Sequence, residues 1–110
     1  MKFEVVILKS AKADLRDLKG YLNKQFGRDV WLESYAKIRV VIDNLKTFPF
    51  SGTVPEALEQ INLMQYRQVL SGKNRIVYEV RQSVIYVHLI ADSRRDMKTL
   101  LMRRLLRVDG

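Results

Sequence analysis

Residues 74–91, NRIVYEVRQSVIYVHLIA, contain two runs of β-branched and aromatic residues separated by a short polar group at residues 81–83. This pattern is typical of a β-hairpin. In the first run, alternate apolar residues share one face, namely Ile76, Tyr78 and Val80. The other face, which carries Arg75, Val77, Glu79 and Arg81, is expected to be partly wet. The second run, residues 84–90, is apolar on both faces, as in a covered central strand. The hairpin is therefore predicted to form the middle of a sheet.

The flanking sequence predicts two helices before the hairpin and one after it. Ser10 is a suitable N-cap for a helix ending at Gly27, and Asp29 is placed to cap a second helix over residues 30–46. So short a connection makes these helices antiparallel neighbours. The remaining predicted elements are strands at residues 2–7 and 64–70, a helical turn at residues 55–59 and a terminal helix over residues 97–107.

The order of these elements predicts an α+β fold. An N-terminal strand and an antiparallel helical hairpin would pack on an antiparallel sheet, and a C-terminal helix would follow. The length of 110 residues suits one domain, covering residues 1–110. The chain has no cysteine, which excludes disulfides and thiolate zinc sites, and no apolar stretch of membrane-spanning length. We therefore expect a cytoplasmic protein with no cofactor and no bound metal.

The charge is large and unevenly distributed. The formal net charge is +8, and residues 1–63 hold ten basic and eight acidic side chains, whereas residues 64–110 hold ten basic and four acidic ones. Basic domains of this size usually bind nucleic acid, an acidic protein or an anionic membrane surface. A solvated basic surface without any such partner is the alternative.

Basic residues of the second half could form one cationic site. Strand ends in an antiparallel sheet can bring them together, where guanidinium groups would grip phosphate and Tyr66 could stack on a base. The basic members of this candidate site are Arg67, Lys73, Arg75, Arg94 and Arg95. Pairing of these residues with nearby Asp92, Asp96 and Glu79 is the competing interpretation.

The terminal helix has more apolar residues than one packing face needs. An inward stripe is formed by Met97, Leu100, Leu101 and Leu105, and Met102 and Leu106 widen it. This surplus indicates either a binding surface for a protein partner, with Met97, Leu101 and Leu105 as its core, or a helix sunk deeply into its own domain.

His88 is the only histidine in the chain, and it lies within a predicted apolar strand. A lone histidine can act as a general acid or base near neutral pH. Because no second imidazole and no cysteine accompanies it, a structural role is favoured.

Taken in order along nearly the whole chain, several short segments resemble the RelE/ParE superfamily of bacterial type II toxins. These segments are AKADL at residues 11–15, YL at 21–22, LKTFPFSG at 45–52, YR at 66–67, NRIVYEV at 74–80 and SRRD at 93–96. The resemblance implies a toxin neutralised by a cognate antitoxin that wraps the helical hairpin and the sheet. The net charge of +8 fits an antitoxin segment that is acidic and amphipathic.

The superfamily includes two activities. The RelE branch cleaves messenger RNA on the ribosome, and Arg67, Arg75 and Arg95 match its basic positions. Its C-terminal Tyr or His would fall near residues 99–101, where this chain has only Thr and Leu, and leucine cannot move a proton. The ParE branch poisons DNA gyrase without chemistry of its own. The resemblance therefore favours a ParE-like gyrase inhibitor over a ribosome-dependent endoribonuclease, with an inactive partner-binding relative as a third possibility.

Overall fold

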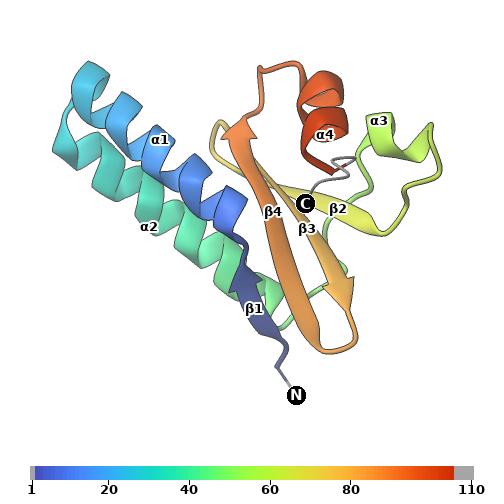
Figure 1. Cartoon of the computed structure of the whole chain (residues 1–110). Helices are drawn as coiled ribbons and strands as arrows, with labels where there is room; N and C mark the ends of the chain where they lie inside the picture. The colour runs from blue at the N-terminus through green and yellow to red at the C-terminus, as the bar shows by residue number, and fades with distance from the viewer. Residues whose placement is uncertain (1, 106–110) are drawn as a thin grey trace.

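The computed structural model describes residues 2–105, in which a four-stranded sheet lies between two layers of helices (Figure 1). The strands follow the order β1-β4-β3-β2 across the sheet. The elements in chain order are β1 (Glu4–Ile7), α1 (Lys9–Phe26), α2 (Arg28–Leu45), α3 (Glu56–Glu59), β2 (Tyr66–Ser71), β3 (Asn74–Arg81), β4 (Val84–Asp92) and α4 (Met97–Leu105). The predicted α+β class is confirmed.

The hairpin expected from residues 74–91 is formed by β3 and β4, and it occupies the middle of the sheet. Its two-residue turn places Gln82 at a φ of 54°, in the left-handed region. The register shifts between Val77 and Tyr78, so that His88 is the extra residue of a bulge on β4. The alternation along β4 therefore changes at His88.

β1 departs from the all-antiparallel sheet that the sequence suggested. It pairs with β4 in parallel register, Glu4 opposite Val84 and Ile7 opposite Val87. A parallel neighbour is possible because the chain passes through α1, α2, β2 and β3 before β4 begins, which supplies the long connection that parallel strands need. β1 thus forms one edge of the sheet.

The helical hairpin covers one face of the sheet, as predicted. Ala11, Ile38 and Leu45 from the helices pack against Ile76, Tyr78 and Val87 of the strands. Gly27 ends α1 with a φ of 96°, which confirms its expected place at the helix end.

Both predicted N-caps are wrong. α1 begins two residues earlier than expected, after Leu8, and the Ser10 hydroxyl donates to the carbonyl oxygen of His88 at 3.3 Å. Asp29 lies in the first turn of α2, which begins directly after Gly27. Both side chains are inside the helices because each helix begins two residues before the expected position.

The opposite face of the sheet, expected to be partly wet, is covered by α3 and α4 (Figure 1). Val77 is fully buried there and Glu79 is only 6% exposed. Leu58, Leu89 and Leu101 form the centre of this second core. The prediction of a wet face failed because it did not include the layer that α4 adds. The predicted end of the terminal helix, with Leu106, lies outside the described residues.

The far end of the helical hairpin extends beyond the sheet (Figure 1). Apolar side chains at this end are therefore partly exposed, and Phe26 is 61% exposed. Within residues 2–105, each helix is too short or too polar to cross a bilayer.

Candidate functional site

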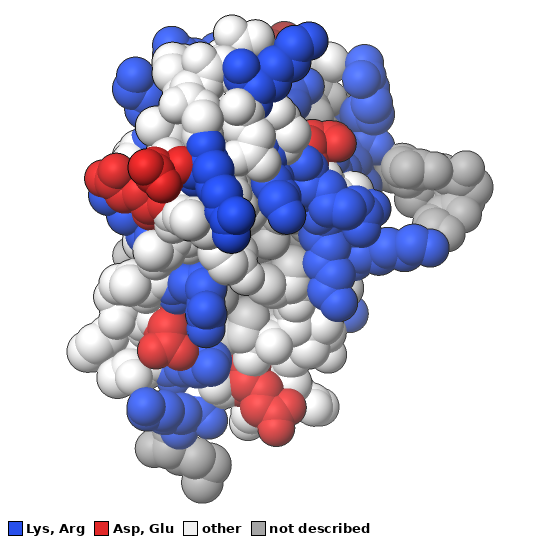
Figure 2. Space-filling view, turned by 90° about the vertical axis from the view of Figure 1, so that its left-hand side faces the viewer, with Lys and Arg blue, Asp and Glu red and all other residues white. Residues whose placement is uncertain are grey.

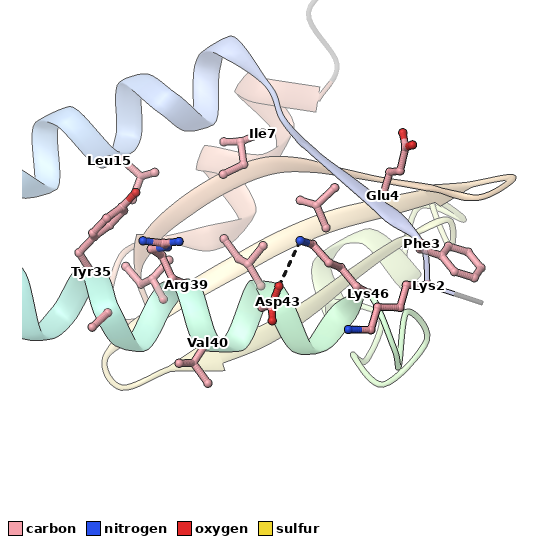
Figure 3. A pocket seen from close by; sticks show the side chains of 14 residues that line it. Lys2, Phe3, Glu4, Ile7, Leu15, Tyr35, Arg39, Val40, Asp43 and Lys46 are labelled. Atoms are coloured by element: carbon pink, nitrogen blue, oxygen red, sulfur yellow. Dashed lines mark ion pairs between the residues drawn. The ribbon is translucent and has the colours of Figure 1, made fainter.

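A large groove lies between α2 on one side and β1 with the start of α1 on the other (Figure 3). Its volume is about 1020 Å³. The floor is apolar, with Val5 and Ile7 from β1, Leu15 from α1, and Ile38 and Ile42 from α2. It is open to solvent and lined by three elements, as suits a polypeptide segment better than a small compact ligand.

The rim of this groove carries charges of both signs. Arg39 points into it, with its guanidinium carbon 5.9 Å from the centre of the Tyr35 ring (Figure 3). Lys46 is paired with Asp43 at 3.1 Å, so its charge is partly compensated. Arg39 and Lys2 form no ion pair with any residue from 2 to 105, so both give the rim uncompensated positive charge.

β1 offers an open strand edge beside the groove. The N–H groups of Glu4 and Leu8 donate to Ser83 and Val87 of the neighbouring strand region, at 3.0 and 3.1 Å. Because successive peptide groups of a strand point to opposite sides, those of Val5 and Ile7 face away from β4. No strand within residues 2–105 pairs with that outer edge. An extended segment could therefore hydrogen-bond to β1.

The predicted cationic site does not form as one cluster. Lys73 and Arg75 lie at the β2–β3 turn, and Asn74 is paired with Asp92, which lies two residues before the adjacent Arg94 and Arg95 of the following turn. Four of the five basic residues thus share one end of the sheet. Arg67 lies near the other end of β2.

Arg67 also faces the opposite side of the sheet from Arg75. It is paired with Tyr78 of the first core and donates to the carbonyl oxygen of Gly52 at 2.8 Å. Arg75 donates to Gln68 Oε1 at 2.7 Å. Successive residues of a strand face opposite sides, so the single site containing Arg67 is contradicted.

Other members of the predicted site are engaged or buried. Arg94 binds Asp92 through two contacts, at 3.0 and 2.8 Å, and these hydrogen bonds lower the pKa of Asp92 to about 2. Tyr66 is 9% exposed and Leu101 is fully buried, while Met97 and Leu105 pack against the second core. Stacking of Tyr66 on a base and docking of a partner on Leu101 are thus excluded in this conformation. The alternative that α4 is sunk into its own domain is confirmed.

A buried polar cluster was missed from the sequence. The carboxylate oxygen Oε1 of Glu79 accepts from His88 Nε2 at 3.0 Å and from Arg81 Nη2 at 2.9 Å. The Tyr66 ring meets the His88 ring edge-to-face, with centroids 5.2 Å apart. The bulge turns His88 toward this cluster. The only sequence signal was that Glu79 and His88 lie on consecutive strands of the same hairpin.

Burial and hydrogen bonding act oppositely on this pair. Burial lowers the pKa of His88, which keeps the imidazole neutral and leaves Nε2–H as the donor to Glu79. Burial alone would raise the pKa of Glu79, but the hydrogen bonds from Arg81 and His88 outweigh it and lower that pKa. A neutral imidazole beside a carboxylate and a guanidinium is therefore stable here.

A second missed feature links α1 to α4. Arg104 Nη1 and Nη2 donate to both carboxylate oxygens of Asp14, at 3.0 and 2.9 Å, and Nη1 also donates to the carbonyl oxygen of His88 at 3.0 Å. Asp14 accepts in addition from the Ile90 N–H at 2.9 Å. This ion pair seals the part of the β4 edge that lies beyond the end of β1. Its partners are 90 residues apart in the chain, so no local pattern indicates it.

The arrangement of possible metal ligands among the described residues gives no support for a metal centre. Among residues 2–105, no three His, Asp or Glu side chains come close enough together to hold an ion.

A family model described as "ParE toxin of type II toxin-antitoxin system, parDE" matches residues 5–97. Among solved structures, the chromosomal ParDE system from P. aeruginosa aligns with a TM-score of 0.68 and 14% identity, over 83% of this chain and 96% of that chain. The toxin–antitoxin complex RelBE2 from Mycobacterium tuberculosis aligns with a TM-score of 0.59 and 14% identity, over 84% and 99% of the two chains. A search of curated proteins finds no match. At these identities the two structures show a common fold.

Proposed function

The chain belongs to the ParE toxin family of type II toxin–antitoxin systems, whose model spans residues 5–97, and on this premise we propose that it inhibits DNA gyrase in the cytoplasm and is neutralised by a cognate antitoxin. The observation that carries the antitoxin part is the apolar groove beside the open edge of β1. The gyrase target rests on the family and on the absence of Tyr or His at residues 99–101.

The groove supports an antitoxin segment of defined chemistry. Its apolar floor would accept the apolar side chains of the segment, and the open N–H and C=O groups of Val5 and Ile7 would hydrogen-bond to its backbone. Arg39 on the rim and the net charge of +8 favour acidic side chains and steer them during association. The proposed ligand is therefore an acidic segment that is extended where it meets β1.

Proline substitution tests this antitoxin site sharply. In Val5→Pro the lost N–H is one that faces away from β4, so the sheet should tolerate the change while the bond to a partner disappears. We expect binding of the cognate antitoxin to weaken at least tenfold by titration calorimetry. Val6→Pro is the contrasting variant, because the Val6 N–H faces β4 and its loss should destabilise the fold. Unchanged affinity of a folded Val5→Pro protein would contradict β-strand addition at this edge.

Charge reversal gives an independent test of the rim. Arg39→Glu should slow association with the antitoxin at low salt, because the steering charge is inverted. Lys37→Glu is the matched control on α2, where Lys37 is already paired with Glu33 at 3.4 Å. Equal association rates in the two variants would place the partner elsewhere.

The gyrase target is tested with purified components. The protein is incubated with gyrase and relaxed plasmid, and supercoiling and trapped cleavage complexes are measured. Inhibition that disappears when the antitoxin is added first is the expected result. Normal supercoiling with no trapped complex would rule out gyrase as the target.

One observation favours a second candidate function, a ribosome-dependent endoribonuclease. The pairing of His88 with Glu79, beside Arg81, supplies a group able to transfer a proton, which residues 99–101 lack. Position-specific cuts in mRNA on programmed ribosomes, abolished by His88→Gln, would support this candidate. Arg67→Ala is the control, since Arg67 lies on the other face of the sheet.

A further inference from the structure

The outer face of α1 carries a row of positive charges that neither the groove nor the buried cluster uses. Its four members recur at three- and four-residue spacing, and we call them the basic stripe: Lys9, Lys12, Arg16 and Lys19. All four are exposed, and none forms an ion pair with any residue in the described range 2–105. Figure 2 views the molecule from the side of the helical hairpin, where Lys and Arg are more prominent than Asp and Glu.

The acidic residues of α1 lie away from this stripe. At 100° per residue, Asp14 lies opposite the mean direction of the stripe and Asp17 lies about 120° from it. Asp14 is also engaged, because it binds Arg104 and the Ile90 N–H. The positive charge of the basic stripe is therefore not compensated along its own helix.

A glycine supports close approach of a partner at this face. Gly20 lies in the interior of α1, where glycine disfavours the helix, and it borders the stripe one turn after Arg16, about 40° from it around the helix. A Cβ at Gly20 would meet nothing within 4 Å, so no contact inside the described residues requires the missing side chain. A partner backbone that lies against the helix would give a reason for it.

We propose that the basic stripe binds the phosphate backbone of duplex DNA. The distance from Lys9 to Lys19 along the helix is about 15 Å, over which one DNA strand carries about four phosphates. The stripe contains no apolar side chain to bury, whereas the centres of protein interfaces are depleted in Lys and rich in apolar and aromatic residues. It also has no aromatic ring on which an unpaired base could stack. A dense, regular polyanion fits this surface better than an acidic protein or a single strand.

The binding is expected to be independent of sequence and strongly dependent on salt. Four phosphate contacts give a slope of log K against log salt of about −3.6, so affinity should fall about 150-fold between 50 and 200 mM salt. With two contacts removed the slope becomes about −1.8 and the fall about 12-fold. These values can be measured without gyrase, so this inference goes beyond the proposed function and can fail separately from it.

The experiment is fluorescence anisotropy of a labelled 20-base-pair duplex with the full chain. Lys12→Gln/Lys19→Gln is compared with Lys24→Gln/Lys37→Gln, which makes the same change in net charge outside the stripe. We expect the first variant to halve the salt slope and the second to leave it near the wild-type value. Circular dichroism confirms that both variants are folded.

Three results would overturn the inference. The two double variants could lose affinity equally, which would indicate only a general effect of net charge. A single-stranded oligonucleotide could bind as tightly as the duplex. Polyglutamate could compete as well as unlabelled duplex at equal charge, which would indicate an acidic protein as the partner.

Discussion

Removal of Arg104 should destabilise the fold much more than removal of its exposed neighbour Arg103. The side chains of Arg104 and Asp14 are 21% and 14% exposed, so their pair is mostly shielded from water. Loss of one partner of a buried pair costs about 3–5 kcal/mol, whereas an exposed pair contributes about 0–1 kcal/mol. The Ile90 N–H still binds Asp14 in Arg104→Gln, which reduces the penalty. We therefore expect a loss of about 2–3 kcal/mol in the free energy of unfolding.

For a chain of this size that loss should lower Tm by about 10–20 °C. The assay is urea and thermal unfolding followed by circular dichroism, with Arg103→Gln as the matched control expected within about 0.5 kcal/mol of wild type. A double-mutant cycle with Asp14→Asn should give a coupling energy of about 2 kcal/mol. If Arg104→Gln unfolds like Arg103→Gln, the link between α1 and α4 does not stabilise the molecule and the reasoning is refuted.

Three further changes probe other parts of the fold by unfolding measurements. Tyr78→Phe should lower the free energy of unfolding by about 2–3 kcal/mol, because the hydroxyl donates to the Pro49 carbonyl at 2.8 Å and accepts from the Gly52 N–H at 3.0 Å, and both groups would be left buried without a partner. A loss below about 0.5 kcal/mol would contradict this. Gly20→Ala should stabilise the fold by about 0.5–1 kcal/mol, since the new methyl group meets open space; destabilisation would show a steric conflict on α1. Burial lowers the pKa of His88, so between pH 7 and pH 5 the unfolded chain binds a proton more readily than the folded one, and the stability of the fold falls as the pH falls. His88→Gln should lose less stability over that range than wild type does, and an equal loss would refute the assignment to His88.

The parts of the fold that the sequence predicted are those encoded by local repetition. Alternation along residues 74–80 and the helix break at Gly27 depend only on neighbours a few residues away, so the hairpin and the two helices could be inferred. The direction of β1 could not, because parallel and antiparallel edge strands have the same alternation. Its pairing with β4 depends on contacts made about 80 residues apart.

The candidate site was predicted less well because it depends on register. Arg67 and Arg75 look equivalent in sequence, but one residue of register decides which face each side chain takes. The bulge at His88 has the same effect, because simple alternation would put His88 and Ile90 on one face, whereas Ile90 packs in the first core and His88 faces the second. The pairing of Asp14 with Arg104 required the arrangement of three elements at once.

The position of the basic stripe on α1 connects the two proposed interactions. Leu15 lines the groove, and the neighbouring Arg16 and Lys19 belong to the stripe, so one helix contributes to both surfaces. An acidic segment seated in the groove would bring its carboxylates to the same helix as those cations, and charges closer than the Debye length of about 8 Å at physiological ionic strength interact. It would therefore reduce the positive potential that a DNA backbone encounters on α1, without covering the stripe. Neutralisation by an antitoxin would then act through charge as well as through occupancy of the groove, and the part due to charge would weaken with rising salt while the part due to apolar burial would persist.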